Sequence, residues 1–197
     1  MSEFSRRELL RNVALATTLG GVTPAMAQHV HRMAAEDKIV SGGVYKPKAF
    51  NDHEYRTLQR LADLIIPADE KDPGALAAGT IDWIDLMSSE NPDLKNIYTG
   101  GVFWLDGAMR RRYGSDFLGA KPEEQTAMLD LIAYKKNESP DLGPGIKFFS
   151  WARKMVVDAY YTSPIGIKAI GYIGNTAVAK FEIPQEVIDY ALKRCPV

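Results

Sequence analysis

The sequence has a single cysteine, Cys195, two residues from its end. One cysteine cannot form a disulfide within its own chain, and it cannot supply a multi-thiolate zinc site or a Cys-x-x-Cys-His haem attachment motif. In an exported protein, a lone thiol either stays free or pairs with a second chain. The cysteine content therefore excludes an internal disulfide framework and leaves these two alternatives for Cys195.

The chain also lacks an excess of charge of one sign. It has 24 Lys and Arg residues against 25 Asp and Glu residues, and its longest basic run is Arg110-Arg111-Arg112. A nucleic-acid-binding protein usually carries a basic patch or stripe, so nucleic acid is not an expected partner. With 197 residues, 46% of them hydrophobic, the chain is long enough to form one globular domain with a core.

No hydrophobic run is long enough to span a membrane. The uncharged stretch Asn12 to Val22 has 11 residues, whereas a transmembrane helix needs about 20. Ser5-Arg6-Arg7 precedes this stretch and Ala25-Met26-Ala27 follows it, which is the order of a basic region, an apolar region and a small-residue cleavage site. The pair Arg6 and Arg7 predicts a twin-arginine (Tat) signal peptide over residues 1–27.

Cleavage after Ala27, with Ala25 as the other small residue of the cleavage site, would leave Gln28 as the new terminus. We therefore expect a periplasmic protein that folds before export. The alternative is a cytoplasmic amphipathic helix that happens to begin with two arginines.

Motifs of catalysis and cofactor binding are missing as well. The sequence has no Gly-x-Ser-x-Gly, no His-Glu-x-x-His and no Gly-x-Gly-x-x-Gly motif, so we assign no catalytic, cofactor-binding or metal-binding residue. His53 is the one histidine in the expected folded part. It is either a ligand or base, or simply a polar surface residue in the first turn of a helix.

What is present is a series of helical patterns. Residues 28–49 have scattered charges and glycines without a period, and we interpret them as an extended arm. The domain proper is expected over 50–197, where apolar spacing and capping residues predict an all-α fold of about six helices. These helices are expected over residues 51–66, a short segment after Thr80, 96–113, 122–136, 146–161 and 184–194.

Three features of this domain allow two interpretations each. The acidic loop 68–74 is either a cation site or a solvated loop. Asp82 and Asp85 are either an acid–base pair or the outer, solvated side of a short helix. Gly100, Gly101 and Gly107 either allow a neighbouring element to pack closely or form a phosphate-binding loop, but the spacing and the preceding strand of such a loop are missing.

Residues 161–175 combine glycines, small polar residues and tyrosines without a helical period. Segments of this kind are often found at binding surfaces. The residues that we select as a candidate partner interface are Tyr161, Ser163, Gly171, Tyr172, Gly174 and Asn175.

Three stretches of the chain resemble the gluconate 2-dehydrogenase subunit 3 family. The first, 50–85, contains Leu-Ile-Ile-Pro-Ala-Asp at 64–69 and Pro-Gly-Ala at 73–75. The second, 105–129, contains Tyr113-Gly114. The third, 149–175, contains Tyr-Tyr-Thr-Ser-Pro at 160–164 and Gly-Tyr-Ile-Gly-Asn at 171–175. Together they cover most of the chain after the expected signal peptide.

The resemblance implies a non-catalytic small subunit of an exported sugar or sugar-acid dehydrogenase complex. In such complexes a flavoprotein of the glucose-methanol-choline type carries FAD and oxidises the substrate, and a c-type cytochrome with haem accepts the electrons. The small subunit supplies the export signal and helps the flavoprotein to mature, and the complex associates with the inner membrane. Gluconate, glucose and fructose all stay open as substrates.

Two further hypotheses complete the sequence-based picture. We predict that Cys195 forms a disulfide with the catalytic subunit, with a free thiol as the alternative. For the whole chain, the alternative function is a stand-alone periplasmic binding or scaffold protein of the same fold.

Overall fold

The structure is a computed structural model that describes residues 24–172, 174 and 183–194. Arg6, Arg7, Asn175 and Cys195 lie outside these residues. The described part consists of eight α-helices and one short 3-10 helix, without a strand, which confirms the all-α prediction. None of these helices combines the length and the apolar character that a membrane crossing needs.

Helix α3 (Asp52–Ile65) begins where the sequence predicts. The Asn51 side chain accepts a hydrogen bond from the Glu54 backbone N–H, and the Glu54 carboxylate accepts one from the Asn51 backbone N–H. This capping box satisfies two backbone donors that would otherwise have no partner. The apolar face of α3, including Leu58 and Leu61, is buried in the core.

Helices α4 (Thr80–Ser89) and α5 (Pro92–Tyr113) follow. Helix α5 begins at Pro92, four residues before the predicted start. The Asn91 side chain accepts hydrogen bonds from the backbone N–H groups of Asp93 and Leu94, and Pro92 occupies the first turn, where its missing N–H costs nothing. The segment Asn91-Pro92-Asp93 is thus a start signal that periodicity alone does not reveal. Gly114 ends the helix in the left-handed region, at φ 80°.

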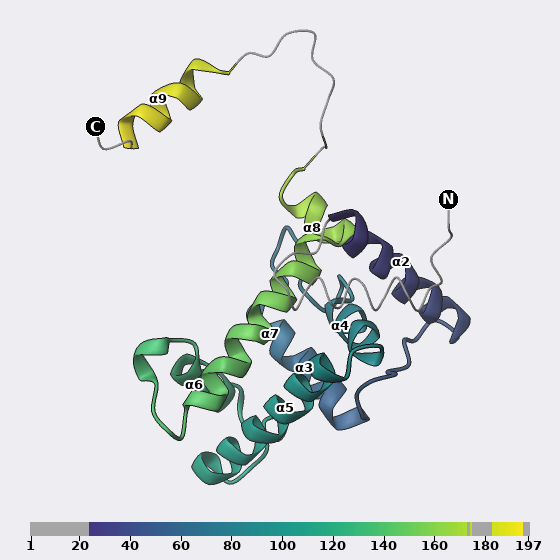
Figure 1. Cartoon of the computed structure of the whole chain (residues 1–197), viewed down its shortest axis with the longest axis vertical. Coiled ribbons are helices and arrows are strands. Elements are labelled where there is room, and N and C mark those ends of the chain that lie inside the picture. Colours follow the sequence, from purple (N-terminus) through teal and green to yellow (C-terminus); the bar gives the residue numbers. More distant parts are fainter. Residues whose placement is uncertain (1–23, 173, 175–182, 195–197) are drawn as a thin grey trace.

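Helix α6 (Pro122–Ile132) and the 3-10 helix η1 (Lys135–Asn137) lead to the long helix α7 (Gly143–Tyr161). Helix α7 packs against α3, α4, α5, α6 and the short helix α8 (Pro164–Ala169), and Figure 1 shows it running through the body of the molecule. Because α7 starts at Gly143, the predicted loop 137–145 is shorter than expected.

Helices α5 and α7 interlock through two glycine–aromatic pairs. A Cβ atom at Gly101 of α5 would lie 1.9 Å from a ring atom of Phe148, and one at Gly145 of α7 would lie 2.1 Å from a ring atom of Trp104. Each helix therefore provides one glycine and, three residues later, one aromatic ring to the other. The prediction that glycines in this region allow close packing is confirmed for Gly101, whereas a Cβ at Gly100 would meet nothing within 4 Å.

The expected extended arm over 28–49 is wrong for its first part, because residues Pro24–Val40 form helix α2. Its buried side chains are Ala27, Val30, Met33 and Ala34, and α2 packs against α4. Their spacing of three and four residues fits a helix, but the apolar stripe is narrow and lies among charged residues, which hides its period. Gly42 and Gly43, both at positive φ, follow the helix. The folded body therefore begins before Phe50.

The C-terminal helix α9 (Gln185–Arg194) has no buried residue. Figure 1 shows it apart from the other helices. Its start and end agree closely with the predicted helix over 184–194.

Candidate partner interface

A groove lies between helices α2 and α8, near the C-terminal end of α7. Its volume is about 710 Å³. We call it the α2/α8 groove and define it by the residues that line it: Gln28, His31, Arg32, Ala35, Ala77, Ala78, Ser163, Pro164, Ile165 and Ile167. Most of these side chains are small or apolar, and none is a carboxylate.

His31 is one of the residues that line this groove. Its Nε2 atom lies 3.2 Å from the Thr162 hydroxyl, and its ring lies 5.8 Å from the ring of the buried Trp83. Burial lowers the pKa of His31 to about 4, although a hydrogen bond with the Ala159 backbone opposes this shift. His31 is therefore neutral at pH 7, and the groove presents an uncharged wall at this point.

Ser163 has a structural role inside the fold, although it also belongs to the lining of the α2/α8 groove. The residue is fully buried. Its hydroxyl donates to the Tyr160 carbonyl over 2.6 Å and accepts from the Gly166 backbone N–H over 3.0 Å. Ser163 therefore caps the start of α8. A Cβ at Gly166 would lie 2.1 Å from the Tyr160 carbonyl oxygen, so this turn also needs a glycine.

The other selected residues are on the surface where the structure describes them. Tyr161 and Tyr172 are 44% and 57% exposed. Gly171 and Gly174 have positive φ angles and are exposed. The two tyrosines thus supply exposed aromatic surface before and after α8 in the chain, and aromatic residues are enriched at protein interfaces.

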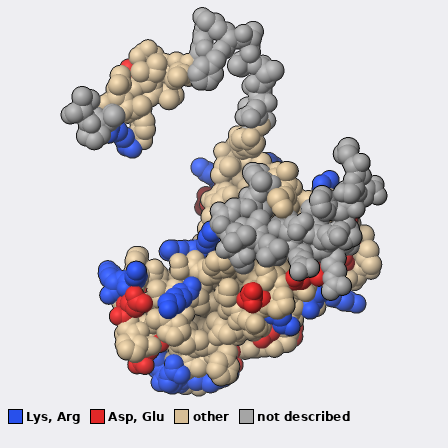
Figure 2. Space-filling view, in the orientation of Figure 1, with Lys and Arg blue, Asp and Glu red and all other residues tan. Residues whose placement is uncertain are grey.

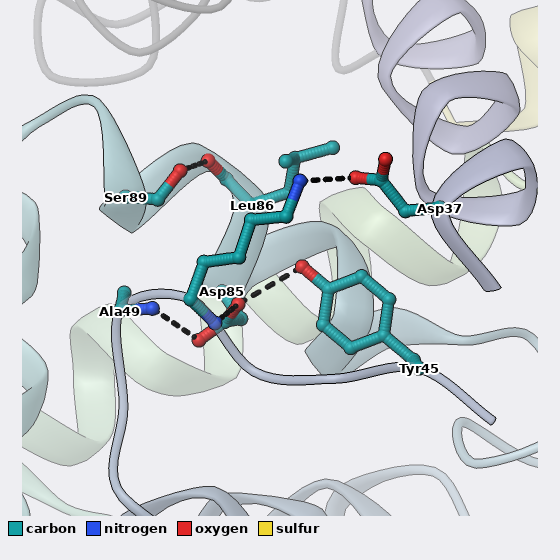
Figure 3. Close-up of polar contacts among 7 residues, drawn as sticks. Asp37, Tyr45, Ala49, Asp85, Leu86 and Ser89 are labelled. Atoms are coloured by element: carbon teal, nitrogen blue, oxygen red, sulfur yellow. Dashed lines mark hydrogen bonds and ion pairs between the residues drawn. The ribbon is translucent and has the colours of Figure 1, made fainter. Parts of the chain in front are cut away.

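Asp85 of α4 is the main polar contact of the segment that leads from α2 to α3. Figure 3 shows this carboxylate between the hydroxyl of Tyr45 and the backbone nitrogen of Ala49. Its Oδ2 accepts from the Tyr45 hydroxyl over 2.9 Å and from the Lys48 N–H over 2.7 Å, and its Oδ1 accepts from the N–H groups of Ala49 and Phe50, each over 3.0 Å. Burial and the nearby carboxylate raise the pKa of the Tyr45 phenol.

The prediction that Asp82 and Asp85 face outward from α4 is therefore wrong. Asp85 is fully buried, and Asp82 is half-buried and accepts a hydrogen bond from the Tyr55 hydroxyl. Burial raises the pKa of Asp82. Asp85 accepts from Tyr45, in the segment before α3, and Asp82 accepts from Tyr55, in α3 itself. The two carboxylates therefore hold these two parts of the chain against α4. Spacing on α4 could not reveal this, because the donors come from residues 45–55.

His53 lies in the first turn of α3, as predicted, but it also forms a specific contact. Its Nε2 atom lies 2.6 Å from Oδ2 of Asp106, whose Oδ1 accepts from the Phe117 backbone N–H over 3.0 Å. The His53 side chain is 42% exposed, whereas that of Asp106 is 7% exposed. Asp106 thus connects α3, α5 and the loop after α5. Neither the ligand interpretation nor the simple surface interpretation anticipated this contact.

The acidic loop 68–74 is organised by one of its own side chains. Asp69 accepts hydrogen bonds from the backbone N–H groups of Lys71 and Asp72, and these bonds lower its pKa. Within the described ranges, no group of three or more His, Cys, Asp or Glu side chains is placed to hold a metal ion. The Tyr160 hydroxyl donates to the Pro73 carbonyl over 2.7 Å, which joins this loop to the end of α7.

Of three comparisons with known proteins, one gave a match. The search of curated proteins and the search of solved structures gave no match. A sequence model of the family described as gluconate 2-dehydrogenase subunit 3 matches residues 52–179, from the start of α3 to beyond α8. This range is well over half of the 197 residues, so the chain belongs to the gluconate 2-dehydrogenase subunit 3 family.

Proposed function

We propose that this protein is the non-catalytic small subunit of an exported, FAD-dependent dehydrogenase of the glucose-methanol-choline type that oxidises a sugar or sugar acid. The observation that carries the proposal is the family match over residues 52–179, because its description implies an accessory subunit of a dehydrogenase. The sequence also supports the proposal. It includes no cofactor-binding motif, and because the cofactor supplies the redox chemistry in such enzymes, we expect another subunit to hold it.

In this proposal the work is divided among the subunits. The small subunit contributes the Tat signal with Arg6 and Arg7 and stabilises the flavoprotein during maturation. The flavoprotein holds FAD, and a c-type cytochrome accepts the electrons in the periplasm, where the complex associates with the inner membrane through the partners. Cys195 would attach the small subunit to the catalytic subunit by a disulfide, which a non-reducing gel would reveal as a band of the summed mass.

We place the contact with the flavoprotein at the α2/α8 groove. Three observations support this choice: the lining of the groove is mostly small and apolar, its histidine is neutral at pH 7, and the exposed Tyr161 and Tyr172 precede and follow α8 in the chain. Buried interface centres are depleted in charge and enriched in aromatic residues. A protruding apolar side chain of the flavoprotein would pack on the small and apolar residues of this groove, with the exposed Arg32 as the one charged residue of its lining.

Substitution of exposed alanines tests this contact with little risk to the fold. Ala35 and Ala77 line the groove and are exposed, so Ala35→Glu or Ala77→Glu places a carboxylate in it. We expect each variant to lower the affinity for the flavoprotein at least tenfold, because the added carboxylate would occupy the groove and would lose its hydration on binding. The measurement is co-purification of the tagged subunit with its flavoprotein, quantified by flavin absorbance.

The matched control is Ala127→Glu, at an exposed alanine of α6 outside the groove. It should leave flavin recovery unchanged. Equal recovery for all three variants would exclude the groove as the contact but not the subunit role, whereas absence of any flavoprotein in the wild-type sample would contradict the subunit role itself.

One observation favours the alternative of a stand-alone binding protein. The groove volume of about 710 Å³ falls in the usual range of small-molecule sites, roughly 300–1,000 Å³. A native pull-down separates the two functions. A yellow complex of two or more chains supports the subunit role, whereas a lone chain carrying a small molecule supports the alternative.

A further inference from the structure

The peptide bond between Ala27 and Gln28 lies inside helix α2, which spans Pro24–Val40. Ala27 is 1% exposed and Val30 is 0% exposed. The Ala27 carbonyl accepts a hydrogen bond from Nε1 of Trp83 over 3.1 Å, and Trp83 is fully buried in α4. The residue that ends the expected signal peptide is thus part of the packed core.

A protease needs its substrate as an exposed, unfolded segment around the bond that it cuts, so a bond within a packed helix is cut only after local opening. Opening the first turn of α2 would expose Ala27 and leave the buried Trp83 N–H without its acceptor. The loss of a buried hydrogen-bond partner alone lowers the open population by on the order of 10- to 100-fold.

We propose that the Ala27–Gln28 bond is a processing site controlled by folding: signal peptidase cuts it while α2 is open, and α2 packed on Trp83 protects it. The proposal rests on the export that the proposed function includes. Since a Tat substrate is folded before export, the exported folded subunit keeps residues that precede Gln28. The leader is then released by opening of α2 rather than by translocation itself.

The main experiment uses the purified full-length chain and purified signal peptidase in detergent, with intact-mass spectrometry over time. A synthetic peptide of residues 15–35 serves as the unfolded reference. We expect the folded chain to be cut after Ala27 at least tenfold more slowly than the peptide. Cutting of the folded chain at the rate of the peptide would overturn the proposal.

Two pairs of variants identify the protecting contacts. Trp83→Phe removes the N–H donor, and Trp151→Phe is its control, because Nε1 of Trp151 is buried without a hydrogen-bond partner in the structure. Val30→Ala weakens the packing of α2 and keeps Trp83. Its control is Ile39→Ala, at a position 76% exposed on the same helix. We expect Trp83→Phe and Val30→Ala to be cut at least fivefold faster than wild type.

The two controls should be cut at the wild-type rate. Circular dichroism identifies any variant that unfolds. If Trp83→Phe unfolds, the comparison of Val30→Ala with wild type still tests the proposal. If neither Trp83→Phe nor Val30→Ala increases the rate, packing of α2 does not protect the bond.

The same question can be answered with the exported protein. The mass of the folded subunit recovered from the periplasm should include residues before Gln28, and a uniform start at Gln28 would contradict the proposal. If no subunit reaches the periplasm, the export role fails instead, while the measurements on the purified chain still decide whether folding controls the cleavage.

Discussion

Asp85 shows how much of this fold can depend on one side chain. Its two oxygens accept four hydrogen bonds, three of them from consecutive backbone N–H groups at Lys48, Ala49 and Phe50. Such bonds are strong because the acceptor is buried and fully satisfied. The chain between α2 and α3 is therefore fixed to α4 through a single carboxylate.

We predict that Asp85→Asn lowers the free energy of unfolding by about 2–4 kcal/mol, because the substitution replaces one acceptor oxygen by an NH2 group, which cannot accept hydrogen bonds and would face donors. Asp130→Asn is the control, at an exposed position of α6, and should change stability by less than about 0.5 kcal/mol. Urea unfolding followed by circular dichroism measures both. Equal midpoints for the two variants would show that Asp85 is not needed to hold this segment.

His31 leads to a prediction about pH. Its pKa of about 4 in the folded protein lies below the ordinary value of 6.5. Between pH 4 and pH 6.5, His31 is therefore protonated in the unfolded chain but neutral in the folded protein. Stability from this residue is complete above pH 6.5 and is lost as the pH falls towards 4. The expected loss between pH 7.5 and pH 5 is about 2 kcal/mol.

The variant His31→Gln, which cannot be protonated, isolates this contribution. The raised pKa values of Asp82 and Asp158 act in the opposite direction, but they are present in both proteins. The difference in unfolding free energy between wild type and variant should therefore fall by about 2 kcal/mol from pH 7.5 to pH 5. A difference that does not depend on pH would mean that His31 titrates normally in the folded protein.

At the scale of elements, the adjacent glycines Gly100 and Gly101 of α5 should respond in opposite ways to substitution by alanine. Gly101→Ala should destabilise the protein by about 1–3 kcal/mol, because its Cβ would overlap the buried ring of Phe148. Gly100→Ala should stabilise it by up to about 1 kcal/mol, because a Cβ there meets nothing within 4 Å and alanine favours the helix. Thermal unfolding of the two variants measures the contrast. Shifts of the same sign would contradict the packing of α7 on α5.

The element scale also shows what the sequence could and could not predict. Helix α3, with its Asn51–Glu54 capping box, was predicted to within one residue at each end, whereas α6 ends at Ile132 and not at the predicted residue 136. Helix α2 was missed because its buried positions form a narrow stripe among charged residues. The partners of Asp85 and Asp106 could not be predicted, because each carboxylate is satisfied by donors from other elements that only the tertiary fold brings close.

For the whole molecule, the central prediction is export of the flavoprotein together with this subunit. Replacing Arg6 and Arg7 by Lys should leave both proteins in the cytoplasm and reduce periplasmic dehydrogenase activity at least tenfold, because a flavoprotein without its own signal leaves only while attached. Activity assays and immunoblots of the two cell fractions measure this. Unchanged periplasmic activity in the double variant would exclude the carrier role.

The control for this experiment keeps Arg6 and Arg7 and changes a residue of the helical domain. The Ala127→Glu variant, at an exposed position of α6, should export the flavoprotein at the wild-type level. Figure 2 shows acidic and basic side chains interspersed on the visible face of the body, so one added carboxylate does not change its electrostatic character.

The interlock of α5 and α7 has a consequence for how this family diverges. Gly101 accommodates Phe148, and Gly145 accommodates Trp104, so neither member of a pair can change size alone without a clash or a void. Aligned sequences of relatives should therefore show correlated substitutions within each pair, with a larger residue at position 101 accompanied by a smaller one at 148. Because the two pairs run in opposite directions between the helices, a relative could even exchange the glycine and the aromatic residue of one pair and keep the same helix crossing.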